Sequence, residues 1–277
     1  MKKLLFILLL ISLQATAQKE IKIMSYNIRN SNAVDGVNKW ENRKQMLANL
    51  ILKVNPDVLG TQEVLMDQYR NLKKMLPEYD VFGVGRNNGK HGGEHSAIFY
   101  KRDKYELLIG GNFWLSEIPS VPASKSWDAA ITRICSWVKL KDKQSGDTFF
   151  VFNTHFDHKG KQARINSAKL LIRTIDSLCG NYPVMVTGDF NFQPDNEGYS
   201  VMTSTNHLVV LQDAYSSDAS NYTDCGFEVS NTNCHRIDYI FYSSHFKRNS
   251  YTLHSDNNGT FYPSDHLTIS ASFGLLK

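Results

Sequence analysis

One stretch of the chain, Gly160–Asn191, joins a helix, a strand and a polar motif, and so indicates the class of fold: GKQARINSAKLLIRTIDSLCGNYPVMVTGDFN. Apolar residues recur at helical spacing over Gly160–Cys179, and Gly180 is typical of a residue that ends a helix. The short apolar run Val184–Thr187 follows and predicts a strand buried on both faces. A helix that leads directly into a buried strand is typical of sheets covered by helices.

Strand-like and helix-like segments alternate along the rest of the chain, without a linker, a repeat or a low-complexity tract. Trp40–Val54 and Met66–Leu76 are predicted helices. The other predicted strands are Ile21–Tyr26, Val58–Gln62, Ser96–Tyr100, Tyr105–Ile109, Ile134–Leu140, Phe149–Thr154, Arg236–Tyr242 and Leu267–Phe273. Because these runs are apolar on both faces, we expect a core of two sheets covered by helices.

The first residues have the composition of an export signal. Two lysines precede the apolar run Leu4–Leu13, which is too short to span a bilayer comfortably, and Ala15-Thr16-Ala17 supplies small residues for cleavage. We therefore expect residues 1–17 to be a signal peptide. Residues 18–277 are expected to form one exported domain, a monomer without a stable membrane anchor, in the periplasm or outside the cell.

Charge and cysteine content narrow the choice of partners only a little. The formal net charge of +4 falls to +2 without Lys2 and Lys3, and no dense basic run indicates a nucleic-acid partner. No CxxC spacing occurs, so a thiolate metal site is not expected. Cys225 and Cys234 flank a polar loop and are the candidate disulfide, whereas Cys135 lies in a strand-like run and is expected to be a buried thiol.

Six short polar clusters each follow an apolar run, where the end of a strand would bring them to one edge of the sheets. They centre on Asn27, Glu63, His155, Asp189 with Asn191, Asp238, and Asp265 with His266. Hard cations prefer oxygen ligands, and imidazole groups can transfer protons. The combination predicts an enzyme that uses a metal ion to hydrolyse a phosphate ester.

The tetrapeptide Gly188–Asn191 is the most specific of these clusters. Residues two apart in an extended segment project to the same side, so Asp189 and Asn191 can converge on one water or phosphoryl oxygen. The carboxylate would orient the attacking water, and the amide would donate to the transition state. An ordinary Asx turn is the competing interpretation.

Two histidines are candidates for proton transfer or phosphate binding. His266 follows Asp265 and needs a partner to fix its tautomer, for which we nominate Asp238. His155 is expected to have Glu94 as its orienting partner. Taken alone, a single histidine is more often a structural residue.

In their order and spacing these clusters resemble the endonuclease/exonuclease/phosphatase superfamily. The matching motifs are Asn27, Glu63, Thr154-His155, Gly188-Asp189-Phe190-Asn191, Arg236-Ile237-Asp238 and Ser264-Asp265-His266. The resemblance implies an α+β fold, a four-layer α/β/β/α sandwich of two mixed β-sheets flanked by helices. It also implies one catalytic cleft built from the loops at the strand ends.

The resemblance further implies the roles of the residues. Glu63 is the implied principal ligand of Mg²⁺, with Mn²⁺ as the alternative, and Asn27 and Asp265 lie near the metal. Asn27 is also a candidate to bind the substrate phosphate. The residues with implied catalytic roles are His155 with Glu94, Asp189, Asn191, and Asp238 with His266.

Two further positions refine the resemblance. Arg29 occupies the place of an acidic residue in related repair enzymes, so we expect one metal ion rather than two. Trp127-Asp128-Ala129-Ala130 followed by Arg133 is similar to secreted relatives of the nocturnin-like deadenylases. In that light Arg133 is a candidate phosphate contact, and pairing of this arginine with an acid is an equally good interpretation.

The predicted function is hydrolysis of a phosphodiester or phosphomonoester by in-line attack of water. The substrate stays open between a small phosphoester, a nucleic acid and a phospholipid head group. A sphingomyelinase-type enzyme would need an exposed apolar hairpin, for which Gly110–Val121, with Phe113, Trp114 and Leu115, is a weak candidate. A non-catalytic binding module on the same scaffold is the alternative from another class.

Overall fold

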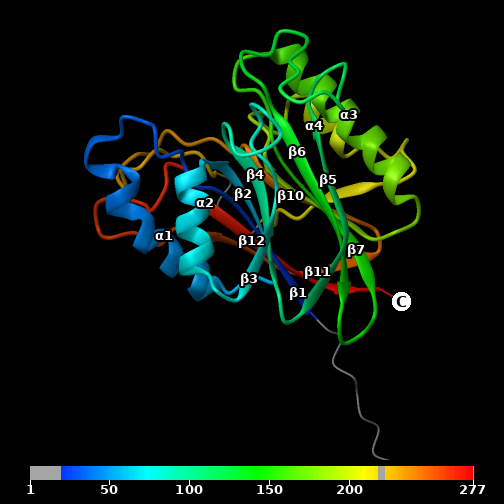
Figure 1. Ribbon diagram of the computed structural model, residues 1–277, viewed down its shortest axis with the longest axis horizontal. Helices are drawn as coiled ribbons and strands as arrows, with labels where there is room; N and C mark the ends of the chain where they lie inside the picture. Colours follow the sequence, from blue (N-terminus) through cyan, green and yellow to red (C-terminus); the bar gives the residue numbers. More distant parts are fainter. Residues whose placement is uncertain (1–19, 218–221, 277) are drawn as a thin grey trace, which may run out of the picture.

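The computed structural model describes residues 20–217 and 222–276, so the predicted export signal lies outside the described residues. Within the described part, no helix is long and apolar enough to cross a membrane. Two six-stranded sheets pack face to face, and helices cover both outer faces (Figure 1). The predicted four-layer sandwich is therefore confirmed.

The first sheet has the strand order β11-β12-β1-β2-β4-β3. Its strands are β1 (Glu20–Asn27), β2 (Val58–Val64), β3 (Tyr79–Phe82), β4 (His95–Lys101), β11 (Phe246–His254) and β12 (Thr268–Leu275). Helices α1 (Trp40–Val54) and α2 (Met66–Met75) cover its outer face (Figure 1), and a 3₁₀ turn, η1 (Gly36–Asn38), precedes α1. Leu47 and Ile51 of α1 are fully buried together with Leu59 of β2, which holds the helix on the sheet.

The second sheet has the strand order β5-β6-β7-β8-β10-β9. Its strands are β5 (Tyr105–Trp114), β6 (Ile134–Asp142), β7 (Thr148–His155), β8 (Val184–Asp189), β9 (Leu211–Asp213) and β10 (Asp238–Ser243). Helices α3 (Lys161–Cys179) and α4 (Glu197–Met202) lie on its outer face (Figure 1). The predicted stripe of α3, including Ala168, Ile172 and Ile175, is buried against Val184 and Val186 of the sheet.

Each sheet contains one parallel pair of strands, β1 with β2 and β7 with β8. Parallel neighbours need a crossover connection, which α1 and α3 provide. The carboxyl ends of all four strands therefore reach the same edge of the sandwich. In the two registers Asn27 lies opposite Gln62, and His155 lies opposite Asp189.

Apolar side chains fill most of the interface between the sheets, but the part near the strand ends is polar. The side-chain amide of Asn153 donates across the interface to the carbonyls of Thr61 (2.8 Å) and Ala97 (3.0 Å). A Cβ atom on Gly60 would lie 2.0 Å from Thr187 Oγ1, so only glycine allows the sheets to approach this closely. The strand ends of both sheets are thus held in a fixed relative position.

Within the candidate hairpin Gly110–Val121, the three residues expected to contact lipid are buried, whereas Ile118 and Val121 are exposed. Strand β5 continues to Trp114 and pairs with β6, so Phe113, Trp114 and Leu115 are buried in the molecule. An apolar run at the end of a strand packs as core when a neighbouring strand covers it.

The cysteine predictions are confirmed. Cys225 and Cys234 form a disulfide in the loop between β9 and β10, and Cys135 is a buried free thiol. Cys179, at the end of α3, is also buried and free.

Candidate active site

A cleft of about 370 Å³ opens at the edge where the strand ends of both sheets meet. Eight of the ten predicted site residues line it: Glu63, Glu94, Arg133, His155, Asp189, Asn191, Asp265 and His266. The other two, Asn27 and Asp238, are buried and hydrogen-bonded to residues that line it. The structure therefore brings the whole predicted set together, although these residues come from every part of the chain.

Asp189 lies at the centre of this set. Its Oδ2 accepts a hydrogen bond from the Asn27 side chain (2.9 Å) and lies 3.3 Å from His155 Nε2 and 3.9 Å from His266 Nε2. Its Oδ1 accepts from the backbone N–H of Asn191 (2.9 Å). Burial, together with the nearby Asp238 carboxylate, raises the pKa of Asp189. A carboxyl group in this environment is suited to taking a proton from water.

Asn27 links Asp189 to Glu63. Its side-chain N–H groups donate to Asp189 and to Glu63 Oε1 (3.0 Å), and its Oδ1 accepts from the backbone N–H of Arg29 (3.0 Å). The amide oxygen is thus engaged by Arg29, and direct ligation of a metal by Asn27 stays a prediction. Burial alone would raise the pKa of Glu63, but the bonds from Asn27 and Asn30 lower it.

Three residues at the site have left-handed backbone conformations that favour glycine. The φ angles are 54° at Arg29, 63° at Glu63 and 51° at Asn191. At Glu63 the strand pairing of β2 with β4 is also irregular, between Thr61 and Val64. Such backbone strain often gathers at functional sites, where it re-aims side chains. Here it directs Glu63 and Asn191 into the cleft.

His266 and Asp238 form the pair that the sequence suggested. His266 Nδ1 lies 2.8 Å from Asp238 Oδ2, and both side chains are buried. Burial lowers the pKa of His266, but the Asp238 carboxylate more than offsets it and raises the pKa well above its ordinary value. The backbone N–H of Asp238 donates to Thr223 Oγ1 (3.1 Å), which fixes the start of β10.

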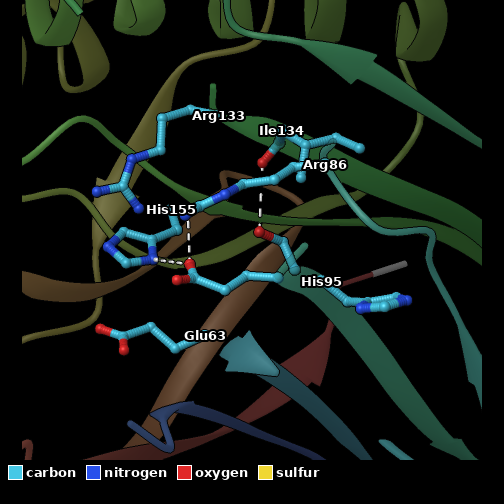
Figure 2. Close-up of a pocket in the computed structure, with 8 residues that line it drawn as sticks. Glu63, Arg86, His95, Arg133, Ile134 and His155 are labelled. Carbon is cyan, nitrogen blue, oxygen red and sulfur yellow. Dashed lines mark hydrogen bonds and ion pairs between the residues drawn. The ribbon is translucent and has the colours of Figure 1, made fainter. Parts of the chain in front are cut away.

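His155 and Glu94 are close, but they are not hydrogen-bonded. His155 Nδ1 lies 4.0 Å from Glu94 Oε2 and has no hydrogen-bond partner, because Glu94 bonds instead to Arg86 Nη1 (2.6 Å). Figure 2 shows Arg86 and Arg133 on one side of His155 and Glu63 on the other. Burial and the charges of Arg133 and Arg86 lower the pKa of His155 well below its ordinary value, so this imidazole is neutral.

Arg133 is a buried guanidinium group with almost no partner. The residue is only 5% exposed, its Nε and Nη1 have no hydrogen-bond partner, and its Nη2 lies 3.2 Å from His158 Nδ1. The pairing with an acid that the sequence left open is present as an ion pair, since Arg133 Nε lies 3.9 Å from Asp157 Oδ2, which is beyond hydrogen-bonding distance. Burial lowers its pKa to about 10, so it remains charged at neutral pH.

Asp157 fixes the loop that precedes Arg133. Its carboxylate accepts the backbone N–H groups of Ala130, Ile131, Lys159 and Gly160 at 2.7 to 3.2 Å. Asp128 accepts two N–H groups at the start of α3, and Trp127 packs on the core beneath that helix. Asp128 and Trp127, which belong to the motif shared with the nocturnin-like relatives, therefore have a structural role, and neither lines the cleft.

Sequence reasoning missed several residues that line or support the site, and three of them carry polar groups that bear on its chemistry. Asn30 holds Glu63 Oε2 through its backbone (3.0 Å) and side chain (2.8 Å), Arg86 pairs with Glu94, and Asp224 lines the cleft. Asn30 follows the Asn27 motif closely enough to have been a candidate. Arg86 and Asp224 lie in loops, and no sequence signal marks them.

The residues present fit a divalent cation. Glu63 and Asp265 are carboxylates that line one cleft, and burial and the charge of Glu63 raise the pKa of Asp265. A hard cation would relieve this repulsion and match the oxygen donors. Asp189, Asp238 and His266 form a second grouping whose ligand atoms lie within 4.8 Å of one another. In that grouping, however, Asp238 and His266 already satisfy each other.

Comparisons with known proteins agree with this geometry. The sequence profile of the Endonuclease/Exonuclease/phosphatase family matches residues 24–266, which include all the predicted site residues. A family member from Bacteroides thetaiotaomicron shares 39% identity, with 94% of this chain and 98% of that chain covered and a TM-score of 0.87. A mannosyl-6-phosphatase from the same organism shares 38% identity, with coverages of 91% and 99% and a TM-score of 0.84.

Among curated proteins, human Nocturnin is 27% identical over 267 residues, which cover 86% of this chain and 59% of that protein. Drosophila melanogaster Nocturnin is equally similar at 27%, with 42% of its length covered. The chain thus spans about half the length of these curated relatives.

Proposed function

The chain belongs to the endonuclease/exonuclease/phosphatase family, and from this premise we propose that it is an exported phosphatase that removes the phosphate from a small soluble phosphomonoester. Phosphoester hydrolysis itself follows from family membership. The choice of a small monoester is the further step, and the buried guanidinium group of Arg133, whose Nε and Nη1 have no hydrogen-bond partner, carries it.

A buried cation without a partner costs several kcal/mol, so a protein retains one where a bound anion completes it. Arg133 lines the same cleft as Asp189 and His155, so its positive charge would lie beside a phosphoryl group bound there. A phosphomonoester carries between one and two negative charges at neutral pH, whereas a diester carries one. The positive charge of Arg133 therefore stabilises a bound monoester more than a bound diester.

The size of the cleft and the name of one similar solved structure support a small substrate. A volume of about 370 Å³ is at the lower end of the range for small-molecule sites. The mannosyl-6-phosphatase neighbour, by its name, acts on a phosphorylated sugar. A sugar phosphate is therefore the first substrate to test.

The proposed reaction joins a water oxygen to phosphorus, breaks the ester P–O bond, and releases an alcohol and inorganic phosphate. Asp189 orients the water and takes its proton. Asn191 and the two imidazole groups of His155 and His266 donate to the phosphoryl oxygens as charge develops. Mg²⁺, held by Glu63 and Asp265, would supply further stabilisation of that charge when bound.

Release of inorganic phosphate from the monoesters, compared with release of 4-nitrophenol, nucleotide or phosphocholine from the diesters, tests the proposal. Mannose 6-phosphate, 4-nitrophenyl phosphate, bis(4-nitrophenyl) phosphate, oligoadenylate and sphingomyelin are compared with Mg²⁺, with Mn²⁺ and with a chelator. We expect metal-dependent turnover of the monoesters to exceed that of every diester. Faster cleavage of the diesters would point to a nuclease or phospholipase, and no turnover of any substrate would favour the binding module.

Export is the second part of the proposal. The signal-like composition of residues 1–17 and the Cys225–Cys234 disulfide support it, because disulfides persist in oxidising compartments. Fractionation of the producing cells and mass spectrometry of the mature protein test it. We expect an N-terminus at Gln18, and retention of the intact chain in the cytoplasm would contradict export.

A further inference from the structure

The cleft has two chemically different ends. In the second sheet, β6 and β10 lie on opposite sides of β8. Arg133 directly precedes β6. Asp189 ends β8, so it lies between these two ends. Arg133 and His158 line the first end, and Asp224 lines the cleft beside β10. The backbone of Asp224 pairs with that of His235 and of His266 in isolated β-bridges, and this pairing places Asp224 beside the strand.

The carboxylate of Asp224 is free. Among residues 20–217 and 222–276, no hydrogen bond or ion pair involves its side chain. Its backbone, in contrast, is fixed on both sides, since its N–H donates to the carbonyl of His235 (2.9 Å) and its carbonyl accepts from the N–H of His235 (2.9 Å). The backbone therefore holds Asp224 at the cleft, and its carboxylate has no partner among the residues that the structure describes.

The residues on either side of Asp224 are also held firmly. Thr223 Oγ1 accepts from the backbone of Asp238, and Cys225 is joined to Cys234. The N–H of Cys225 donates to the carbonyl of Asp265 (3.1 Å). The loop is thus bound to the same segments that carry Asp238 and Asp265. A binding group on such a rigid support can discriminate between ligands.

A fixed carboxylate accepts hydrogen bonds and donates none, so it favours hydroxyl groups and repels a second anion. With the phosphate held toward Arg133, the alcohol portion of the substrate would extend toward Asp224. We propose that Asp224 is the specificity-determining residue, which selects a neutral, hydroxyl-rich leaving group and excludes one that carries further phosphates. This inference rests on the proposed function for the orientation of the substrate.

Binding to a hydrolysis-deficient protein tests the inference separately from turnover. Asp189→Asn and Asp189→Asn/Asp224→Ala are titrated in the presence of Mg²⁺ with mannose 6-phosphate and with phenyl phosphate, which has no hydroxyl groups. We expect Asp224→Ala to weaken binding of the sugar phosphate about tenfold, which corresponds to the loss of one good hydrogen bond to a charged group. The affinity for phenyl phosphate should not change. Asp103→Asn, an exposed acid outside the cleft, is the matched control in the Asp189→Asn background.

A second measurement tests the exclusion of anions. Removing the charge with Asp224→Asn should strengthen binding of glucose 1,6-bisphosphate severalfold relative to mannose 6-phosphate. The inference would be overturned if Asp224→Ala changed the affinities for sugar phosphate and phenyl phosphate equally. It would also be overturned if the Asp189→Asn parent did not bind the sugar phosphate more tightly than phenyl phosphate. Failure of the proposed function would show instead as lack of phosphate release by the wild-type protein, whatever these binding ratios are.

Discussion

Gln62 donates a hydrogen bond of 2.7 Å to the Oδ1 atom of Asn153, which joins the two sheets at the base of the cleft. Gln62 immediately precedes Glu63, and Asn153 lies two residues before His155. The two halves of the site are therefore joined by a buried polar network, which also includes the bonds from Asn153 to Thr61 and Ala97. Buried polar networks of this kind are costly when one member is removed, because the remaining groups lose their partners.

Replacing Asn153 by leucine should destabilise the protein by about 2–4 kcal/mol, since it leaves the Gln62 amide without its acceptor and removes both donors to the opposite sheet. Chemical denaturation measures the change in free energy of unfolding. Asn249→Leu, at an exposed position, is the control and should change stability by no more than about 0.5 kcal/mol. A similar effect of both substitutions would show that the contact does not join the sheets.

Asp189→Asn should lower kcat by about 10²–10⁴-fold, because an amide cannot take the proton from water. The fold should survive, since asparagine can still accept the hydrogen bond from Asn27. Steady-state kinetics, with circular dichroism as the check on folding, make the comparison. Asp103→Asn should retain wild-type turnover. Near-normal turnover in Asp189→Asn would exclude Asp189 as the group that activates water.

Glu63→Gln and Asp265→Asn should each weaken Mg²⁺ binding, measured by calorimetry on the purified protein without substrate, about tenfold or more. Asp238→Asn should leave the metal affinity nearly unchanged, because Asp238 is expected to act through His266. Glu41→Gln, on the exposed surface of α1, is the control for the loss of a charge. If Asp238→Asn weakened Mg²⁺ binding and the other two substitutions did not, the metal would be assigned to the grouping of Asp189, Asp238 and His266.

Asp157 should contribute to stability in a pH-dependent way. Burial would raise its pKa, but the four backbone N–H groups it accepts lower the value to about 2, below the ordinary value of 3.8. A lowered pKa means that the contribution is complete above about pH 4 and is lost as the pH falls toward 2.

The difference in unfolding free energy between wild type and Asp157→Asn, measured at several pH values, should therefore be largest near neutral pH and shrink below pH 4. At neutral pH we expect a difference of about 2–3 kcal/mol, as for the loss of hydrogen bonds to a charged group. Urea denaturation over this pH range gives the comparison. A difference that does not change with pH would mean that the carboxylate is not held ionised by these N–H groups.

Sequence reasoning located the parts of the fold and site that depend on local pattern. The stripe of α3 and the strand that leads to Asp189 follow from apolar periodicity, and the pairing of His266 with Asp238 follows from the need of a buried imidazole for a partner. The short or polar strands β3, β9 and β11 were not predicted. These strands lie at the sheet edges or next to them, where side chains need not be apolar.

The remaining differences arise from tertiary contacts that spacing cannot show. Glu94 was predicted to orient His155. In the structure the Glu94 carboxylate instead accepts a hydrogen bond from Arg86, which the turn before β4 brings near. Asp224 lies in a loop whose position depends on the disulfide and on pairing with His235. Each of these contacts is set by how loops from distant segments pack, and a single sequence contains no periodic signal for that.

The left-handed conformations at Arg29, Glu63 and Asn191 have a consequence for protein engineering. Glycine at these positions would relax the backbone, so a screen that rewards heat resistance alone would be drawn to them. At Glu63 and Asn191 the same change would delete a side chain that lines the cleft. Libraries aimed at a more robust biocatalyst should therefore keep both codons fixed and explore the helices on the outer faces instead.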